Sequence, residues 1–309
     1  MAQTFRADNT IRKWEISSRF TMARRHTHKL PDNRALALGR VRSIMRRHVN
    51  DKELLQKMDA IIKDQLNRNM IELVKHPSQH QGSVHYLPHQ PVIKSDHATT
   101  KVRLVYDASS KTRKGDLSLN DCLGKGPLLL NDLTGILLRS RLYAGLLLGD
   151  IEKAFLQIEI KEEDRDALRF FWPANILDPD TPYVVYRFTR VAFGLTSSPA
   201  HLAAVIQYHL KTKHADSQLA QEVNKNLYVD NVLLGLEKKI SSGYPQRLKI
   251  LFQDAGMNLR EFNSNKREVL KNVPPEDLAK ETEVTKILGI KWNMKDDTYM
   301  LRLPTFSTV

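Results

Sequence analysis

Two aspartates in apolar surroundings are the residues of this sequence best suited to chemistry. Asp150 follows the apolar run LLLG at 146–149, and Asp230 lies inside the largely apolar run 227–234. If these runs form neighbouring strands, the two carboxylates converge and repel each other unless a cation lies between them. Hard oxygen ligands suit Mg²⁺, and such a pair can position two ions for displacement at phosphorus. Taken singly, each residue is more readily explained as an ordinary turn aspartate.

The elements that must position these residues follow from apolar spacing. Spacings of three and four predict a helix over 51–71, with Asn50 or Asp51 as its N-cap. Alternating β-branched and aromatic residues predict strands, and glycine and proline predict loops. In the first half of the chain we therefore expect paired strands at 84–93 and 102–106, a loop at 113–127, a helix at 128–142 and a short buried strand at 146–148.

The second half of the chain contains the second aspartate in a predicted hairpin. Residues 227–236 are apolar on both sides of Asp230-Asn231, as expected for a buried hairpin with a polar tip. The other expected elements are a strand at 183–188, a helix from Ser198 to about Lys211, a helix at 246–255 that stops at Gly256, and a last hairpin made by 287–292 and 299–303.

Composition limits the class of protein. The chain has 309 residues, 41% of them hydrophobic and only one a cysteine, and a net charge of +13. This suits about two domains or lobes, and it excludes internal disulfides and zinc sites with two thiolates. The first 50 residues hold twelve Lys or Arg and three acids, so an N-terminal arm carries +9 of the charge, which suits nucleic acid or a solvated terminus.

Features that the sequence lacks bear on the location of the protein and on metal binding. No apolar run approaches the roughly 20 residues of a membrane span, and no secretory signal is recognisable. We therefore expect an intracellular protein, cytoplasmic or nuclear, without a membrane partner. His76, His80, His85 and His89 are not expected to bind zinc, because no cysteine or acid completes the set.

A wider set of motifs resembles one family of enzymes. Tyr228-Val229-Asp230-Asn231, with Asp150 earlier and Phe155 five positions after it, resembles the palm of reverse transcriptases, whose hairpin usually reads Tyr-x-Asp-Asp. Eight segments, which appear in family order and cover roughly residues 30 to 300, resemble the BEL/Pao group of LTR retrotransposons. They are VHYLPHQPVIK (84–94), KVRLVYDAS (101–109), SLNDCLGKGP (118–127), GDIEKAFLQI (149–158), EEDRDALRFFW (162–172), FGLTSSPAHL (193–202), LYVDNVLLG (227–235) and KILGIKWN (286–293).

The resemblance implies an RNA-directed DNA polymerase domain that transfers nucleotides to a primer 3′-hydroxyl. Its expected partners are an RNA or DNA template with a primer, and dNTPs. Asp150 and Asp230 would bind two Mg²⁺ or Mn²⁺ ions, Asn231 would complete the catalytic set, and Phe155 would lie against the sugar and reject a 2′-hydroxyl. The residues implied to bind the nucleotide are Lys94, Arg103, Ile151, Phe155, Phe193, Gly194, Ser198, Pro199, Tyr228 and Lys266. Core packing for Phe155, and a solvated strand face for Arg103 and Lys94, are the alternatives.

The resemblance also implies an architecture. We expect an α+β right-hand polymerase with fingers and palm, and with the thumb largely absent because little follows Leu303. The expected parts are a basic, partly disordered arm at 1–40, fingers at 41–135 and 160–190, and a palm with a terminal hairpin at 136–159 and 191–309.

Asn231 is the departure that bears on chemistry, because it stands where the family usually has a second aspartate. An amide keeps an acceptor oxygen but lacks the charge, so the cluster attracts cations less strongly. A second hypothesis is therefore a catalytically impaired remnant that only binds nucleic acid. A third, a nucleotidyl cyclase with a similar sheet, explains neither the segment around Arg103 nor SSPAHL (197–202).

Overall fold

The computed structural model describes residues 30–80, 82–96, 99–237, 243–280, 282 and 284–300. The chain divides into two compact units, Met1–Leu128 with Phe155–Leu202, and Leu129–Ala154 with Ala203–Val309. The chain therefore crosses between the units three times. Most of the basic arm, residues 1–29, lies outside the described residues, whereas helix α1 begins at Arg34, inside the segment assigned to that arm.

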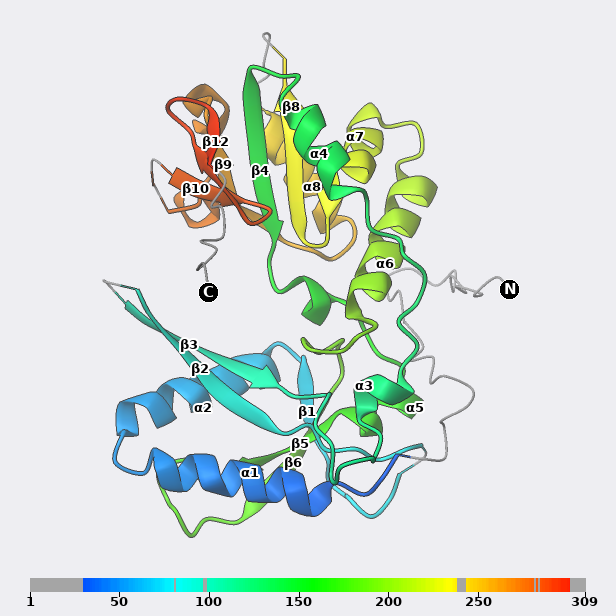
Figure 1. Cartoon of the computed structure of the whole chain (residues 1–309), viewed down its shortest axis with the longest axis vertical. Coiled ribbons are helices and arrows are strands. Elements are labelled where there is room, and N and C mark those ends of the chain that lie inside the picture. Colours follow the sequence, from blue (N-terminus) through cyan, green and yellow to red (C-terminus); the bar gives the residue numbers. More distant parts are fainter. Residues whose placement is uncertain are drawn as a thin grey trace, which may run out of the picture. The chain divides into compact units, whose positions relative to one another are not determined.

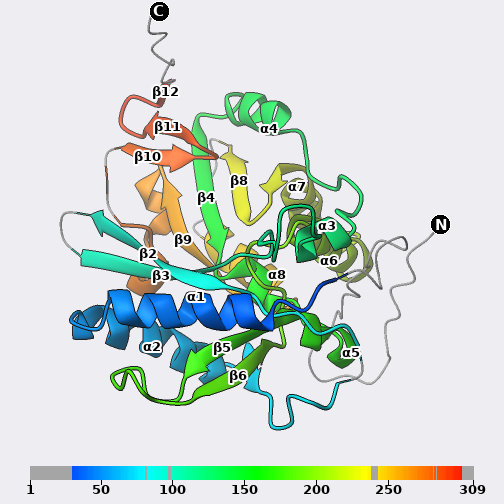
Figure 2. The ribbon, with the colours of Figure 1, turned by 60° about the horizontal axis from the view of Figure 1, so that its bottom comes forward.

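The first unit contains the helices α1 and α2 and two antiparallel sheets (Figure 1). Helix α1 packs through Ala37 and Val41 against Phe171 and Val185 of the three-stranded sheet β1-β6-β5, and Figure 2 shows it running across β5 and β6. The remaining strands form a separate hairpin, β2-β3. The elements are α1 (Arg34–Arg47), α2 (Lys52–Asn67), β1 (Ile71–Leu73), β2 (His89–Asp96), β3 (Thr99–Tyr106), α3 (Leu119–Cys122), η1 (Ala154–Gln157), α5 (Glu162–Arg165), η2 (Asp166–Leu168), β5 (Arg169–Pro173) and β6 (Tyr183–Phe188).

Helix α2 shows why local sequence predicted much of this unit. The Asp51 side chain accepts a hydrogen bond from Leu54 N at 3.0 Å, which satisfies one of the free N–H groups at the start of the helix. Leu54, Leu55 and Met58 are buried at helical spacing. The helix ends at Asn67, earlier than predicted, because Asn69 takes a left-handed φ of 53° and turns the chain into β1.

Two histidines of the first unit are core residues. His85 accepts a hydrogen bond at Nε2 from the Asn33 amide at 3.2 Å, and burial lowers its pKa to about 4. His89 lies among the rings of Tyr106, Phe170 and Trp172. Burial lowers the pKa of His89 to about 4, although a hydrogen bond to the Leu87 backbone acts in the opposite direction. Neither imidazole can gain a proton without placing an uncompensated charge in the core.

We expect these histidines to make the fold acid-sensitive. Unfolded histidine binds its proton near pH 6.5, whereas His85 and His89 bind one only near pH 4. Stability is therefore fully present above pH 6.5 and is lost as the pH falls toward 4, by about 3 kcal/mol per histidine. Urea unfolding across this range should show that His89→Phe loses less stability than the native protein, while the exposed His80→Phe does not differ from it. Parallel pH curves for the native and His89→Phe proteins would contradict this explanation.

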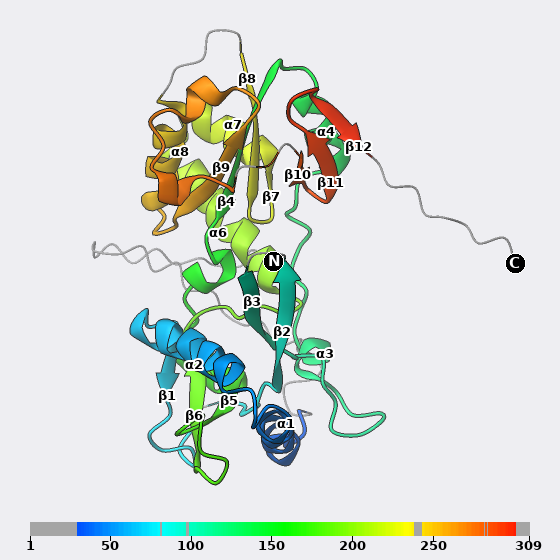
Figure 3. The same ribbon diagram turned by 90° about the vertical axis from the view of Figure 1, so that its left-hand side faces the viewer.

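The second unit is built on a four-stranded sheet with the order β7-β8-β4-β9. On one face, Leu146 and Leu233 pack against Ile136 of α4 and against Ile287 and Trp292 of a small three-stranded sheet. Figure 3 shows α8 on the other side of the four-stranded sheet. The elements are α4 (Leu133–Ser140), β4 (Gly145–Ile151), α6 (Ser198–Lys213, which begins in the first unit), α7 (Gln218–Asn226), β7 (Leu227–Tyr228), β8 (Asn231–Leu236), α8 (Tyr244–Gln253), β9 (Leu259–Ser264), η3 (Arg267–Leu270), η4 (Pro275–Asp277), β10 (Val284–Ile287), β11 (Ile290–Asn293) and β12 (Thr298–Met300).

Several predicted boundaries were wrong for local reasons. The expected last hairpin is a three-stranded sheet, because Leu288 and Gly289 take positive φ values of 50° and 92° and split 287–292 into β10 and β11. The predicted loop 113–127 contains helix α3, capped by Ser118. Helix α4 begins at Leu133, later than expected, because Asp132 caps it through Gly135 N at 2.7 Å. Residues 301–303 lie outside the described part of the chain.

The helices of the described residues are short. The longest, α2 and α6, have 16 residues each. None of them combines the length and apolar character that a membrane span needs.

Candidate active site

Strand pairing in the second unit brings the two predicted aspartates together. Asp150 on β4 pairs with Asn231 on β8, and Ile151 N donates a hydrogen bond to Asp230 O at 2.9 Å. Because side chains alternate along a strand, Asp150 points to the same face as Leu146 and Leu148. The sequence predicted that Asp150 follows the end of its strand. In the structure it lies within β4.

The electrostatics of Asp150 show how unfavourable its charge is without a cation. Burial first, and then the charges of Asp230 and Glu261, raise its pKa to about 7, while the charge of Arg260 acts in the opposite direction. A bound proton or a bound cation would relieve the same repulsion. The carboxylates of Asp150 and Asp230 are thus chemically suited to hold divalent cations, and they are the residues that would do so.

Asn231 contacts its neighbour directly. Its Nδ2 donates to Asp230 Oδ1 at 2.7 Å, so the amide occupies one acceptor position of the carboxylate. An aspartate at this position would instead add a negative charge beside Asp230. The hydrogen bond therefore stabilises the present sequence while reducing the attraction of the cluster for cations.

The turn that carries Asp230 is strained. Val229 adopts a left-handed φ of 56°, which is uncommon for a residue branched at Cβ and costs roughly 1–3 kcal/mol. Tyr228, on its other side, packs against the cluster of Leu233 and Trp292. The strained turn is thus held between a packed tyrosine and strand β8, where it fixes the position of Asp230.

Sequence reasoning missed the neighbours on β9. The pairing of β4 with β9 shifts between Leu148 and Asp150, and Glu261 takes a left-handed φ of 53° at this irregularity. The charge of Glu261 raises the pKa of Asp150. Arg260 forms an ion pair with Glu152 at 3.3 Å. A single extra residue in a strand has no periodic signal in the sequence, so this bulge was not predictable.

In the first unit, the structure joins Phe155 and Phe193. Their rings meet edge to face with centroids 5.0 Å apart, and Phe193 is 44% exposed. The following Gly194 has a φ of +93°, and a Cβ at this position would lie 2.7 Å from Tyr106 O. Only glycine fits there, so Phe193 is presented from a loop seated on the end of β3.

Asn120, which sequence reasoning also missed, fastens this loop. Its Nδ2 donates to Gly194 O at 2.9 Å and to Ser109 Oγ at 2.8 Å. Its Oδ1 accepts from Thr196 N at 2.9 Å. Ser198 continues the network by donating from Oγ to Ala192 O at 3.0 Å. Asn120 lies in the segment SLND (118–121), two positions after the serine that caps α3. An asparagine so close to a helix cap was the available signal in the sequence.

Comparison with protein-family models supplies the deciding observation. Residues 52–292, well over half of the chain, match the model described as "Reverse transcriptase (RNA-dependent DNA polymerase)". The chain belongs to this family. A search of curated proteins finds no match. A reverse transcriptase domain acts on a nucleic-acid template with its primer and on dNTPs, and enzymes of this family generally use divalent metal ions.

The remaining predicted site residues of the reverse transcriptase domain lie in different places. Arg103 is exposed on β3, opposite Val92 of the β2-β3 hairpin, and Lys94 lies two positions after Val92. Pro199 is the second residue of α6, directly after Ser198, and Ile151 is buried at the end of β4. Lys266 follows β9 beside Gly145, five positions from Asp150, or roughly 17 Å along the strand. The sheet therefore does not bring Lys266 to the carboxylates, and its expected contact with the nucleotide stays a prediction.

Removing the Asn120 side chain tests the importance of the Phe193 loop. We expect Asn120→Ala to lower kcat/KM in primer extension by about 100-fold, because small displacements of substrate-positioning groups have effects of that size. Asn120→Asp keeps the acceptor for Thr196 N but loses both donors, so its activity should fall between the native protein and the alanine variant. Equal activity of all three proteins, with matching melting temperatures, would show that the loop does not position substrate.

Proposed function

We propose that this chain is the reverse transcriptase domain of a BEL/Pao-type LTR retrotransposon. On this proposal it extends a DNA primer on an RNA template. The carrying observation is the pairing of β4 with β8, which sets Asp150 beside Asp230 and Asn231 in a chain that matches the reverse transcriptase family over 52–292. The eight ordered motif segments support the retrotransposon assignment.

The proposed chemistry is nucleotidyl transfer. The primer 3′-hydroxyl attacks the α-phosphate of a dNTP, a new P–O bond forms, and the bond to pyrophosphate breaks. Two Mg²⁺ or Mn²⁺ ions, when bound, supply charge stabilisation for the attacking and leaving oxygens. Asp150 and Asp230 hold these ions, and the Asn231 amide orients Asp230 through its hydrogen bond.

The two units take the roles of fingers and palm in this proposal. The first unit provides Arg103 to offset charge on the triphosphate. It also provides Phe155, which rests on Phe193 and would fill the space of a 2′-hydroxyl, so that deoxyribonucleotides are preferred. The second unit is the palm. Its junctions with the first unit along the chain are 128/129, 154/155 and 202/203, whereas the boundaries expected from sequence are 135/136, 159/160 and 190/191.

Primer extension tests the proposal. With poly(rA)/oligo(dT), dTTP and either Mg²⁺ or Mn²⁺, the native protein should incorporate nucleotide above the level of an Asp150→Ala control. Incorporation that does not exceed the control with either ion, from protein shown to be folded, would remove the polymerase proposal.

The alternative of a remnant that only binds nucleic acid is favoured by one observation. The Asn231 amide occupies one acceptor position of the Asp230 carboxylate instead of adding a ligand charge. Binding of the template and primer without extension, in the native protein, is its expected signature.

A further inference from the structure

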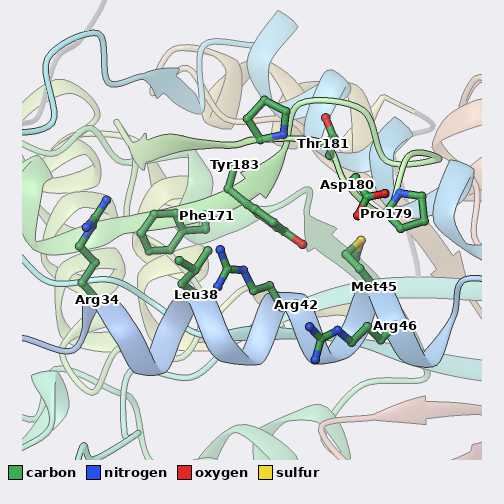
Figure 4. A pocket seen from close by; sticks show the side chains of 11 residues that line it. Arg34, Leu38, Arg42, Met45, Arg46, Phe171, Pro179, Asp180, Thr181 and Tyr183 are labelled. Atoms are coloured by element: carbon green, nitrogen blue, oxygen red, sulfur yellow. The ribbon is translucent and has the colours of Figure 1, made fainter.

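A pocket between α1 and the strands β5 and β6 shares no lining residue with the proposed active site. It has a volume of about 470 Å³ and is made by first-unit residues alone. Figure 4 shows Arg34 and Arg42 of α1 extending toward Phe171 and Tyr183. The spacing of Arg34, Leu38, Arg42 and Arg46 places these side chains on one face of the helix.

The charge of this pocket is not balanced by the protein. Among the described residues, Arg34, Arg42 and Arg46 form no ion pair with a carboxylate, and Asp180 is the only acid among the lining residues. Several other arginines of the same unit are paired: Arg40 binds Asp107 at 2.9 Å, for example. Unpaired cations gathered on one wall of a pocket attract an external anion.

Aromatic rings hold the guanidinium groups in place. The Arg34 guanidinium lies 5.8 Å from the Phe171 ring centre, and that of Arg42 lies 5.7 Å from the Tyr183 ring centre. Burial raises the pKa of the Tyr183 phenol, while the charges of Arg42 and Arg46 act in the opposite direction. The charges of Arg42 and Arg46 thus both act on the tyrosine, and guanidinium groups are planar donors that suit phosphate oxygens.

We propose that this face of α1 binds consecutive phosphates of a single-stranded nucleic acid. Arg42 and Arg46 are one helical turn apart, about 6 Å along the axis, which is comparable to the separation of neighbouring phosphates in an extended strand. Arg34 lies two turns before Arg42 and would contact a phosphate further along. The proposal rests on the nucleic-acid partner of the proposed function, but it does not require catalysis.

Salt dependence of binding tests this site directly. A fluorescein-labelled oligo(rA) is titrated with the full chain, without dNTP or divalent cation, at a series of salt concentrations. Each phosphate contact on a single strand contributes about 0.7 to the slope of log K against log salt. The Arg42→Gln/Arg46→Gln variant should therefore flatten the slope by about 1.4 and weaken binding at low salt by about tenfold per arginine.

Two matched variants separate phosphate binding from a structural role. Arg47→Gln removes the same charge from the same helical turn, outside the pocket, and should leave the slope unchanged. Arg42→Lys/Arg46→Lys keeps the charges but loses the stacking of Arg42 on Tyr183, and should keep most of the slope. If glutamine and lysine variants behave alike, the arginines act through the fold and the proposal is overturned.

A third arm uses a peptide nucleic acid of the same sequence, which has bases but no phosphates. Its binding should not differ between the native and Arg42→Gln/Arg46→Gln proteins. An equal loss for both probes would show that the pocket does not read phosphate. Because no nucleotide is incorporated in any arm, an inactive polymerase leaves these results unaffected, so failure of this site and failure of the proposed function are distinguishable.

Discussion

Asp150→Asn should abolish primer extension and at the same time stabilise the metal-free protein. The variant removes one of the two carboxylates proposed to hold the ions, and its effect should exceed the roughly 100-fold that a lost outer partner of a metal site can cost. It also removes the negative charge that burial, Asp230 and Glu261 make unfavourable.

The sign of the stability effect follows from the raised pKa. Native Asp150 keeps its proton up to about pH 7, whereas in the unfolded chain it releases the proton near 3.8. The stability that this proton gives is full below 3.8 and is lost as the pH rises through 7. In the presence of a chelator, the gain in melting temperature of Asp150→Asn over the native protein should therefore be larger at pH 8 than at pH 5. A gain in melting temperature that does not depend on pH would mean that the pKa of Asp150 is not raised in the folded protein. Asp216→Asn, at an exposed acid between α6 and α7, serves as the control.

Asn231→Asp should have the opposite pair of effects. Replacing the amide removes the 2.7 Å hydrogen bond to Asp230 and sets two carboxylates side by side, so the metal-free protein should melt at a lower temperature. With Mg²⁺ or Mn²⁺ the added charge strengthens cation binding, and we expect primer extension to rise by about 10- to 100-fold.

The Asn231→Asp comparison distinguishes the two proposed functions. Activity that appears only in the variant would identify the native chain as an impaired enzyme, and activity in both would identify a working polymerase. Addition of Mg²⁺ should also raise the melting temperature of Asn231→Asp more than that of the native protein. An unchanged response to Mg²⁺ would show that residue 231 lies outside the cation site.

Sequence patterns predicted the strands of the site because those strands are buried. The leucines of β4 and the apolar residues around Asp230 give continuous hydrophobic runs, which indicate a strand covered on both faces. That these two strands pair, and that Asp150 lies opposite Asn231, required the sheet order.

The features that sequence did not predict depend on single residues with no period. Glu261 reaches the aspartates through a bulge in β9. Asn120 holds Gly194 and Thr196 from 74 and 76 positions away in sequence. The excess of arginines in α1 could be counted in the sequence. That Arg42 and Arg46 lie near Tyr183 depends on how α1 packs against the sheet. Such long-range contacts follow from tertiary packing rather than from local propensity.

The position of β4 inside its sheet has a consequence for synthesis on the ribosome. This strand lies between β8 and β9, both of which follow it in the chain. A nascent polypeptide that has just released β4 therefore presents three consecutive leucines without either partner strand, and must keep them from aggregating until residue 264 has emerged. Recombinant yield should accordingly benefit from a holding chaperone that covers β4 until β8 and β9 have been made.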